Sequence, residues 1–246
     1  DDSGTDADVT IDGGTTALII DTSTIDGDLT LTSGNSSGIT DDGTVTVGGN
    51  LSATTEGGNG VITLNQMAVD GTVALNTNGN GAATIVNDAG LNLAASTVGG
   101  ALSATATTGN ITNSGALAIT GTTTLVTSAN NATITLDNTS NAFTGKVAIT
   151  TNDDSGTDAD VTIDGGTTAL IIDTSTIDGD LTLTSGNSSG ITDDGTVTVG
   201  GNLSATTEGG NGVITLNQMA VDGTVALNTN GNGAATIVND AGLIFA

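Results

Sequence analysis

The sequence predicts an all-β fold, a parallel β-helix (β-solenoid) with about three short strands in each coil and no helix. Three observations lead to this prediction: a long internal duplication, a shorter period inside it, and apolar residues that alternate with Thr, Ser, Asn or Asp. A single coil of such a fold cannot bury its apolar side alone, so stability comes from the stacking of successive coils.

The duplication is the dominant feature of the chain. Residues 1–91 recur without a change at 153–243, an offset of 152 residues. We interpret residues 1–246 as one continuous solenoid, with a repeat unit over 1–152 and a partial second copy over 153–246. Because core and surface positions are equally identical, we infer a recent duplication within an array and expect selection to act on its length.

A shorter period lies inside the unit. Glycine precedes a short alternating strand at Gly27, Gly49, Gly71, Gly100, Gly121, Gly145, Gly179, Gly201 and Gly223, with steps of 22, 22, 29, 21, 24, 34, 22 and 22 residues. A step near 22 suits one coil, so we expect the phrases GNLSAT, GALSAT and GTVALN to stack in a single row. The two long steps require an extra loop or a fourth strand, for which residues 16–20 and 168–172 are candidates.

The alternation has a period of two, as in a strand with one face in water. No segment has the 3.6-residue period of a helix. The residues predicted to point inward are Leu29, Leu31, Ile39, Val45, Val47, Leu51, Ile62, Leu64, Val73, Leu75, Ile85, Leu102, Ile111, Leu117, Ile119, Leu125, Ile134, Leu136, Val147 and Ile149. At about 25 residues per coil, the chain forms roughly ten coils and a rod of about 45–50 Å.

The composition narrows the possible functions. The net charge is −26, with Lys146 as the only base, and the chain has no Trp, Tyr, Pro, Cys or His. Such a surface cannot neutralise phosphates, so we expect no nucleic-acid partner. No apolar run is long enough to span a bilayer, so we expect no membrane insertion. Because catalytic residue types are missing, we predict that the protein is not an enzyme.

Two phrases resemble a known family. GALSATATTGNITNSGALAITGTTTL at 100–125 and ITLDNTSNAFTGKVAIT at 134–150 are similar to the β-strand repeats of filamentous-haemagglutinin-like adhesins. These are large secreted passengers of Gram-negative two-partner secretion and related autotransporter systems. The resemblance implies a right-handed β-solenoid, an extracellular or cell-surface location on the Gram-negative outer surface, and a role in adhesion, aggregation or biofilm formation.

The densest acidic cluster is a candidate calcium site, because closely spaced carboxylates are suitable Ca²⁺ ligands. Its members are Asp153, Asp154, Asp158, Asp160 and Asp164, with the copy Asp1, Asp2, Asp6, Asp8 and Asp12. The cluster lacks the EF-hand pattern and the calcium-binding β-roll nonapeptide, and a solvated loop is the commoner outcome. A second group, Asp26, Asp28, Asp41 and Asp42, is expected on solvated turns. No other cofactor is expected.

Several Asn-x-Ser/Thr triplets are candidate glycosylation acceptors, although many arise by chance in an Asn- and Thr-rich chain. They begin at Asn35, Asn50, Asn110, Asn131, Asn138, Asn187 and Asn202. Lys146 could form an isopeptide link, but we expect an ordinary exposed lysine. Rows of exposed Thr also suggest ice binding, although the Thr-x-Thr motif is interrupted.

The leading hypothesis is a structural or adhesive repeat segment of a very long secreted or cell-surface bacterial adhesin. Its expected partners are further copies of itself, joined end to end as an array or fibre, and a host or neighbouring-cell surface. Ile244 and Phe245 are expected at an apolar terminal face. The alternatives are a calcium-binding adhesive module and an ice-binding solenoid.

Overall fold

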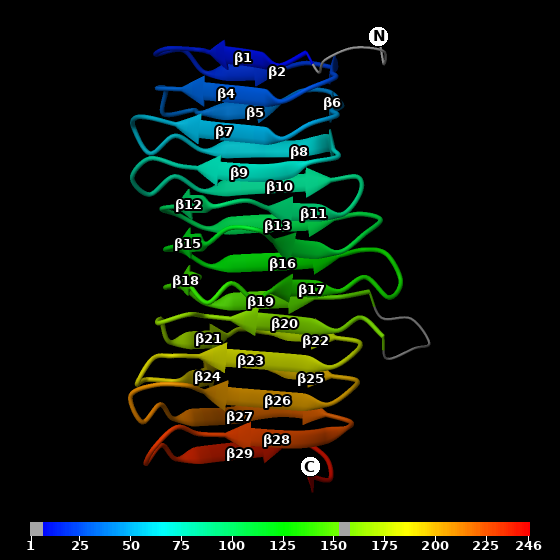
Figure 1. The fold of residues 1–246 in the computed structure, drawn as a ribbon, viewed down its shortest axis with the longest axis vertical. Helices are drawn as coiled ribbons and strands as arrows, with labels where there is room; N and C mark the ends of the chain where they lie inside the picture. Colours follow the sequence, from blue (N-terminus) through cyan, green and yellow to red (C-terminus); the bar gives the residue numbers. More distant parts are fainter. Residues whose placement is uncertain (1–6, 153–157) are drawn as a thin grey trace.

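The predicted fold class is confirmed. The computed structural model describes residues 7–152 and 158–246, which form a parallel β-solenoid of about 11 turns with no helix among them. The described strands belong to two 15-stranded sheets, here called sheet A and sheet B, that face each other along the solenoid (Figure 1). Roughly ten coils were predicted; the count is higher because the first two turns take only 20 and 22 residues, from Val9 to Leu29 and from Leu29 to Leu51.

The main strands of sheet A come one from each turn, in the order of the chain. These strands are β1 (Val9–Asp12), β4 (Leu29–Ser33), β7 (Leu51–Thr55), β9 (Thr72–Asn76), β11 (Leu91–Leu93), β14 (Ile111–Asn113), β17 (Ile134–Leu136), β20 (Val161–Asp164), β23 (Leu181–Ser185), β26 (Leu203–Thr207), β28 (Thr224–Asn228) and β30 (Ile244–Phe245).

Sheet B is built in the same way on the opposite side. Its main strands are β2 (Leu18–Ile20), β5 (Ile39–Asp41), β8 (Ile62–Val69), β10 (Ala83–Asn87), β13 (Leu102–Ala106), β16 (Thr123–Thr127), β19 (Val147–Thr150), β21 (Leu170–Ile172), β24 (Ile191–Asp193), β27 (Ile214–Val221) and β29 (Ala235–Asn239). Short third strands lie at the edges: β3 (Ser23–Ile25), β6 (Val45–Val47), β12 (Ser96–Val98), β15 (Leu117–Ile119), β18 (Ala142–Phe143), β22 (Ser175–Ile177) and β25 (Val197–Val199).

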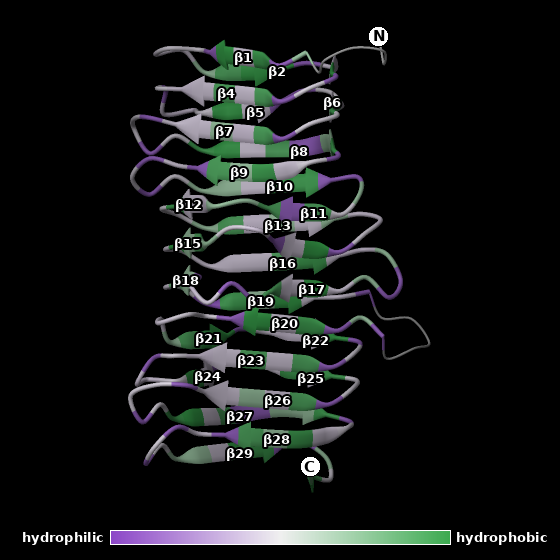
Figure 2. Ribbon diagram, viewed as in Figure 1, coloured by the Kyte–Doolittle hydropathy of each residue, from purple (hydrophilic) through white to green (hydrophobic). Residues whose placement is uncertain are grey.

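The alternating pattern determines which side chains form the core. In sheet A, Leu29 is aligned with Leu51, which is aligned with Val73, so like residues stack on like. Every residue predicted to point inward is buried. Phe143 is also fully buried and is the largest core side chain. Figure 2 shows the apolar residues concentrated in the strands and polar residues in the turns.

The predicted single row of glycine-led strands is wrong. Gly27, Gly49 and Gly71 precede strands of sheet A, but Gly100 and Gly121 precede strands of sheet B. The phrase LSAT therefore lies in sheet A at 51–54 and in sheet B at 102–105. Sequence similarity alone could not distinguish the two sheets, because both place the same alternate residues inside.

The third strands also change from one side of the solenoid to the other where the glycine-led strands change sheets. In Figure 1, β12, β15 and β18 lie along one side of the solenoid, whereas β6, β22 and β25 lie along the other. The long turns change sides as well: they lead from sheet A to sheet B at 34–38, but from sheet B to sheet A at 107–110. The long glycine steps are therefore the places where the pattern shifts by half a turn.

The long step from Gly145 to Gly179 contains a fourth strand in the predicted place, because the step spans about one and a half turns and not because one coil has four strands. Residues 16–20 and 168–172 contain β2 and β21, which are ordinary strands of sheet B. β21 pairs with both β19 and β24, so sheet B continues across the boundary between the two copies. β20 similarly pairs with β17 and β23 in sheet A.

The glycines let successive turns approach closely. A β-carbon on Gly121 would lie 2.5 Å from the carbonyl carbon of Gly100, and one on Gly71 would lie 2.4 Å from the carbonyl oxygen of Gly49. The Gly121 N–H donates to the Gly100 carbonyl at 2.9 Å. Any larger residue would push neighbouring turns apart at these corners, which explains the regular glycine spacing of the sequence.

Candidate functional site

The predicted calcium cluster is only partly within the described residues. Asp1, Asp2, Asp6, Asp153 and Asp154 lie outside them. The others are Asp8, Asp12, Asp158, Asp160 and Asp164. Across residues 7–152 and 158–246, no group of three or more acidic, His or Cys side chains is arranged to hold a metal ion. The calcium prediction therefore stays a prediction.

Four of these carboxylates cap backbone N–H groups. Oδ1 of Asp12 accepts the Gly14 N–H at 2.7 Å, and Oδ1 of Asp164 accepts the Gly166 N–H at 2.7 Å. Oδ1 of Asp8 accepts the N–H of Asp28, one turn later, at 2.9 Å, and Asp160 repeats this in the second copy with the equivalent donor. Asp12 and Asp164 thus stabilise their own turns, whereas Asp8 and Asp160 join the backbone of adjacent turns.

The Asp8 contact begins a ladder along one corner of the solenoid. Asp28 Oδ1 accepts the Asn50 N–H at 2.7 Å, and Asn50 Oδ1 accepts the Thr72 N–H at 2.9 Å and its hydroxyl at 2.8 Å. The second copy contains the same ladder, formed by Asp160, Asp180, Asn202 and Thr224. Each rung satisfies a backbone donor that the end of a strand leaves unpaired.

The second acidic group has a similar role. Asp28 belongs to the ladder, and Oδ2 of Asp41 accepts the Gln66 N–H of the next turn at 2.7 Å. Its copy Asp193 accepts the N–H groups of both Asn217 and Gln218, at 2.9 and 2.7 Å. Asp42 is exposed, as predicted for a solvated turn.

Lys146 joins the two copies of the repeat. Its Nζ lies 2.5 Å from Oδ2 of Asp194 and 4.0 Å from Oδ2 of Asp173, which belong to the two following turns. The hydrogen bond to Asp194 raises the pKa of Lys146 most strongly; desolvation lowers it, and the charges of Asp194 and Asp173 raise it further. Because a protonated amine is not a nucleophile, this geometry does not favour an isopeptide link.

Asp164 has an unusual environment among the described carboxylates. Burial raises the pKa of Asp164, and the charges of Glu208 and Asp137 add to this effect, while the hydrogen bond from Gly166 lowers it. The first-copy equivalent, Asp12, is exposed. The two copies thus place one carboxylate in two environments.

The candidate glycosylation acceptors differ in accessibility. Asn50, Asn110, Asn131 and Asn202 are exposed, whereas Asn35, Asn138 and Asn187 are partly buried. Several use their amides within the fold: Asn35 Nδ2, for example, donates to the Thr15 carbonyl at 2.7 Å. Asn131 has a φ of 60° in a turn. Glycosylation of these residues stays a prediction.

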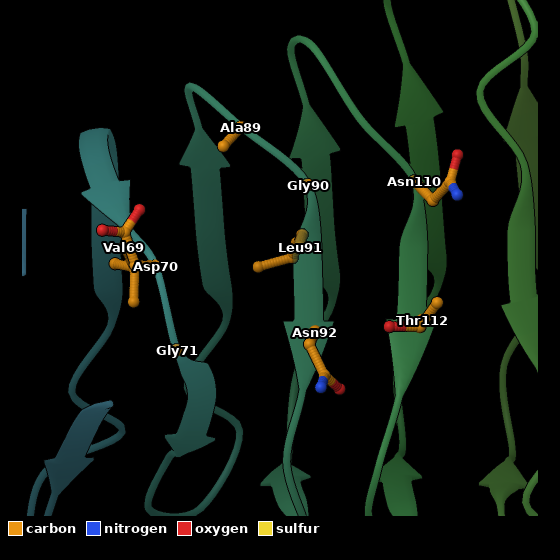
Figure 3. Close-up of a pocket in the computed structure, with 9 residues that line it drawn as sticks. All are labelled: Val69, Asp70, Gly71, Ala89, Gly90, Leu91, Asn92, Asn110 and Thr112. Atoms are coloured by element: carbon orange, nitrogen blue, oxygen red, sulfur yellow. The ribbon is translucent and has the colours of Figure 1, made fainter. Parts of the chain in front are cut away.

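A shallow groove of about 360 Å³ lies beside β11, where the pattern shifts by half a turn (Figure 3). It is lined by Val69, Asp70, Gly71, Ala89, Gly90, Leu91, Asn92, Asn110 and Thr112. Oδ1 of Asn92 is buried there without a hydrogen-bond partner. The groove offers carboxylate, amide and hydroxyl groups for hydrogen bonding, but none of its residues is a nucleophile paired with a general base.

Sequence reasoning missed a set of polar residues inside the core. Asn87, Asn141 and Thr123 are at most 1 % exposed. Asn141 accepts hydrogen bonds from Asn113 Nδ2 and the Leu117 N–H, both at 2.9 Å. The available signal was an Asn or Thr at an inward position of the alternating pattern, as at Asn87 in ATIVN.

The outward Thr rows are interrupted, as the sequence indicated. In sheet A, Thr30 is aligned with Ser52 and then with Ala74.

No helix exists in the described residues, and so none is long and apolar enough to cross a membrane.

Comparison with known families gives one result. The family described as repeats of unknown function (DUF5649) matches residues 6–78 and 80–150, which is 144 of 246 residues. The chain belongs to this family. No curated protein and no solved structure matches it. The family match itself describes no function. A proposal about function therefore depends on the resemblance of the sequence to filamentous-haemagglutinin-like adhesins.

The two DUF5649 units explain the half-turn shift. The glycine-led phrases at Gly27, Gly49 and Gly71 correspond to those at Gly100, Gly121 and Gly145, 73, 72 and 74 residues later. β20 is the eighth strand of sheet A counted from β1, so one 152-residue repeat makes seven turns. Each DUF5649 unit thus makes three and a half turns, and equivalent strands alternate between the two sheets.

Proposed function

We propose that this chain is a rigid spacer segment of a very long secreted or cell-surface bacterial adhesin, with successive repeats extending the distance it reaches. The observation that carries the proposal is the continuity of both sheets across the boundary between two identical copies. At about 4.8 Å per turn, the seven turns of a repeat add about 34 Å of stiff rod.

The chemistry of the surface agrees with a structural role. Several described acidic and amide side chains cap backbone groups of neighbouring turns, and the chain contains neither His nor Cys. We therefore propose that it is not an enzyme. The net charge of −26 keeps parallel rods apart by repulsion, which suits a long extracellular segment.

The proposed location is the outer surface of a Gram-negative bacterium, and the proposed partners are a host or neighbouring-cell surface. Immunogold labelling of thin sections of cells with antibodies to residues 1–246 tests the location. We expect gold outside the outer membrane, at a distance that increases by about 34 Å with each repeat added to the gene. Labelling confined to the cytoplasm would overturn the proposal.

A calcium-binding adhesive module is the second candidate, because residues 1–12 and 153–164 concentrate carboxylates. Thermal melting with 2 mM CaCl₂ or with EDTA separates it from a simple spacer; the concentration is about that of extracellular sites. A calcium-dependent rise in the melting temperature that is lost in Asp158→Asn supports the second candidate. Identical melting curves remove it.

A further inference from the structure

The same group of strands occurs in both copies of the repeat, more exposed in the first copy and covered in the second. β1, β2 and β3 have the same sequence as β20, β21 and β22, but among the described residues only the second set is covered by a preceding turn, formed by β17, β18 and β19. Val161, Ile163 and Leu170 are at most 1 % exposed in the covered set. Their equivalents in β1 and β2 are only partly buried, and Ile19 is 64 % exposed.

Two glycines mark the same difference. Gly166 and Gly14 are equivalent and have φ values of 57° and 55°. A β-carbon on Gly166 would lie 2.3 Å from the carbonyl oxygen of Asn141, whereas one on Gly14 would meet nothing within 4 Å. The turn that includes Asn141 thus fits closely on the second copy, whereas no described residue occupies the matching space over the first copy.

Polar contacts determine the position of the covering turn on the second copy. The Ile149 N–H donates to Ser175 Oγ at 3.0 Å, and Thr151 Oγ1 accepts the Asp178 N–H at 2.9 Å. The Phe143 N–H donates to Thr168 Oγ1 at 3.2 Å. The first copy presents the same three groups on Ser23, Asp26 and Thr16.

The charged side chains of the covering turn and of the strands beneath it are also complementary. Lys146 of the covering turn pairs with Asp194 and Asp173. Their first-copy equivalents are Asp42 and Asp21, and Lys146 is the only Lys or Arg of the chain. These two carboxylates therefore form an acceptor for an ammonium group, and in the second copy that acceptor is filled.

We propose that the face formed by β1, β2 and β3 docks a turn with the sequence of residues 129–152, supplied by another copy of this repeat. The lysine of that turn pairs with Asp42 and Asp21 and determines the register in which one repeat follows the next. This inference depends on the internal duplication and is independent of where in the cell the protein acts.

The first test adds the proposed turn to the chain. Residues 129–152 are placed directly before Asp1, which recreates the native order across 152 and 153. In the original chain, we expect the backbone amides of residues 9–25 to exchange faster than those of residues 161–177. In the extended chain, we expect the two sets of amides to be equally protected and the melting temperature to be higher. The control extension has the same residues in scrambled order. Unchanged exchange at residues 9–25 in the correctly ordered extension would overturn the proposal.

The second test addresses the charge. Asp42→Asn is made in the original and in the extended chain, with Asp194→Asn as the matched control in both. We expect Asp42→Asn to reduce amide protection of residues 18–25 by about two- to five-fold in the extended chain at low salt and to have no effect in the original chain. Asp194→Asn should act in both chains. An equal effect of Asp42→Asn in both would show that no lysine pairs with it and would contradict the proposed register contact.

Discussion

The side chain of Asn87 binds the backbone of Val69 from one turn to the next. Oδ1 of Asn87 accepts the Val69 N–H at 2.8 Å, and Nδ2 donates to the Val69 carbonyl at 3.0 Å and to the Gly90 carbonyl at 2.7 Å. Asn87 is fully buried. One side chain thus replaces the strand pairing that is lost where the third strands end on that side of the solenoid.

The second copy of this side chain offers a matched comparison. Asn239 makes the same contacts to Val221 and Gly242 but is less buried. We expect Asn87→Ala to lower the free energy of unfolding by about 3 kcal/mol, because it leaves buried backbone groups without partners. Asn239→Ala should cost under about 1 kcal/mol, since water replaces its contacts. Urea denaturation measures both, and equal costs would contradict the role assigned to burial.

Removing the hydroxyl group of Thr123 should increase the stability of the fold. The side chain is fully buried and its Oγ1 has no hydrogen-bond partner. We expect Thr123→Val, which keeps the shape, to raise the free energy of unfolding by about 1 kcal/mol. Thr127 is equally buried, but its Oγ1 donates to the Ala132 carbonyl at 3.2 Å, so Thr127→Val should destabilise. If both changes shift the urea midpoint in the same direction, the assignment of the unpaired hydroxyl is wrong.

Gly121 should not tolerate a side chain. Because a β-carbon there would lie 2.5 Å from the carbonyl carbon of Gly100, we expect Gly121→Ala to cost about 1–3 kcal/mol by forcing the turns apart. Gly242 has open space around its β-carbon position, and Gly242→Ala should change stability by less than about 0.5 kcal/mol. Thermal unfolding followed by circular dichroism distinguishes the two, and a harmless Gly121→Ala would contradict the close stacking.

Asp164 should make stability depend on pH. Burial raises its pKa above the ordinary 3.8, so the folded state binds the proton more tightly than the unfolded state. The contribution of this group to stability therefore falls as pH rises from the unfolded value through the folded value. Asp164→Asn keeps an oxygen for the Gly166 N–H, and we expect it to raise the melting temperature above this window.

The control for this prediction is Asp12→Asn in the first copy, where the same carboxylate is exposed. We expect it to change the melting temperature less at every pH. A larger effect of Asp12→Asn than of Asp164→Asn between pH 4 and 7 would contradict the assignment of burial as the cause; this range lies above the unfolded pKa of Asp.

The alternation of apolar and polar residues was sufficient to predict the core, because a strand's two faces are determined locally. It was not sufficient to predict which sheet a strand joins. Leu51 and Leu102 occupy equivalent places in LSAT phrases and are both buried, yet they lie in different sheets. The sheet depends on the number of strands and turns already completed, which the local phrase does not contain.

The capping ladder could not be predicted for a related reason. Asp28 and Asn50 are 22 residues apart, and their contact exists only when the register of two turns is known. The sequence showed where the carboxylates are but not that ten of the 22 described ones accept hydrogen bonds from backbone N–H groups. The calcium site stays a prediction, and the sequence did not show that Asp8 and Asp12 of that cluster accept backbone N–H groups.

The central claim is that parallel turns stack in register and shift by half a turn between DUF5649 units. Oxidative cross-linking of cysteine pairs tests it most directly, because the chain has no Cys of its own. Thr84 is aligned with Ser103 in sheet B, and Ser52 is aligned with Ala74 in sheet A. We predict disulfides in Thr84→Cys/Ser103→Cys and in Ser52→Cys/Ala74→Cys. A disulfide in Ala74→Cys/Ser103→Cys, with none in Thr84→Cys/Ser103→Cys, would contradict the account.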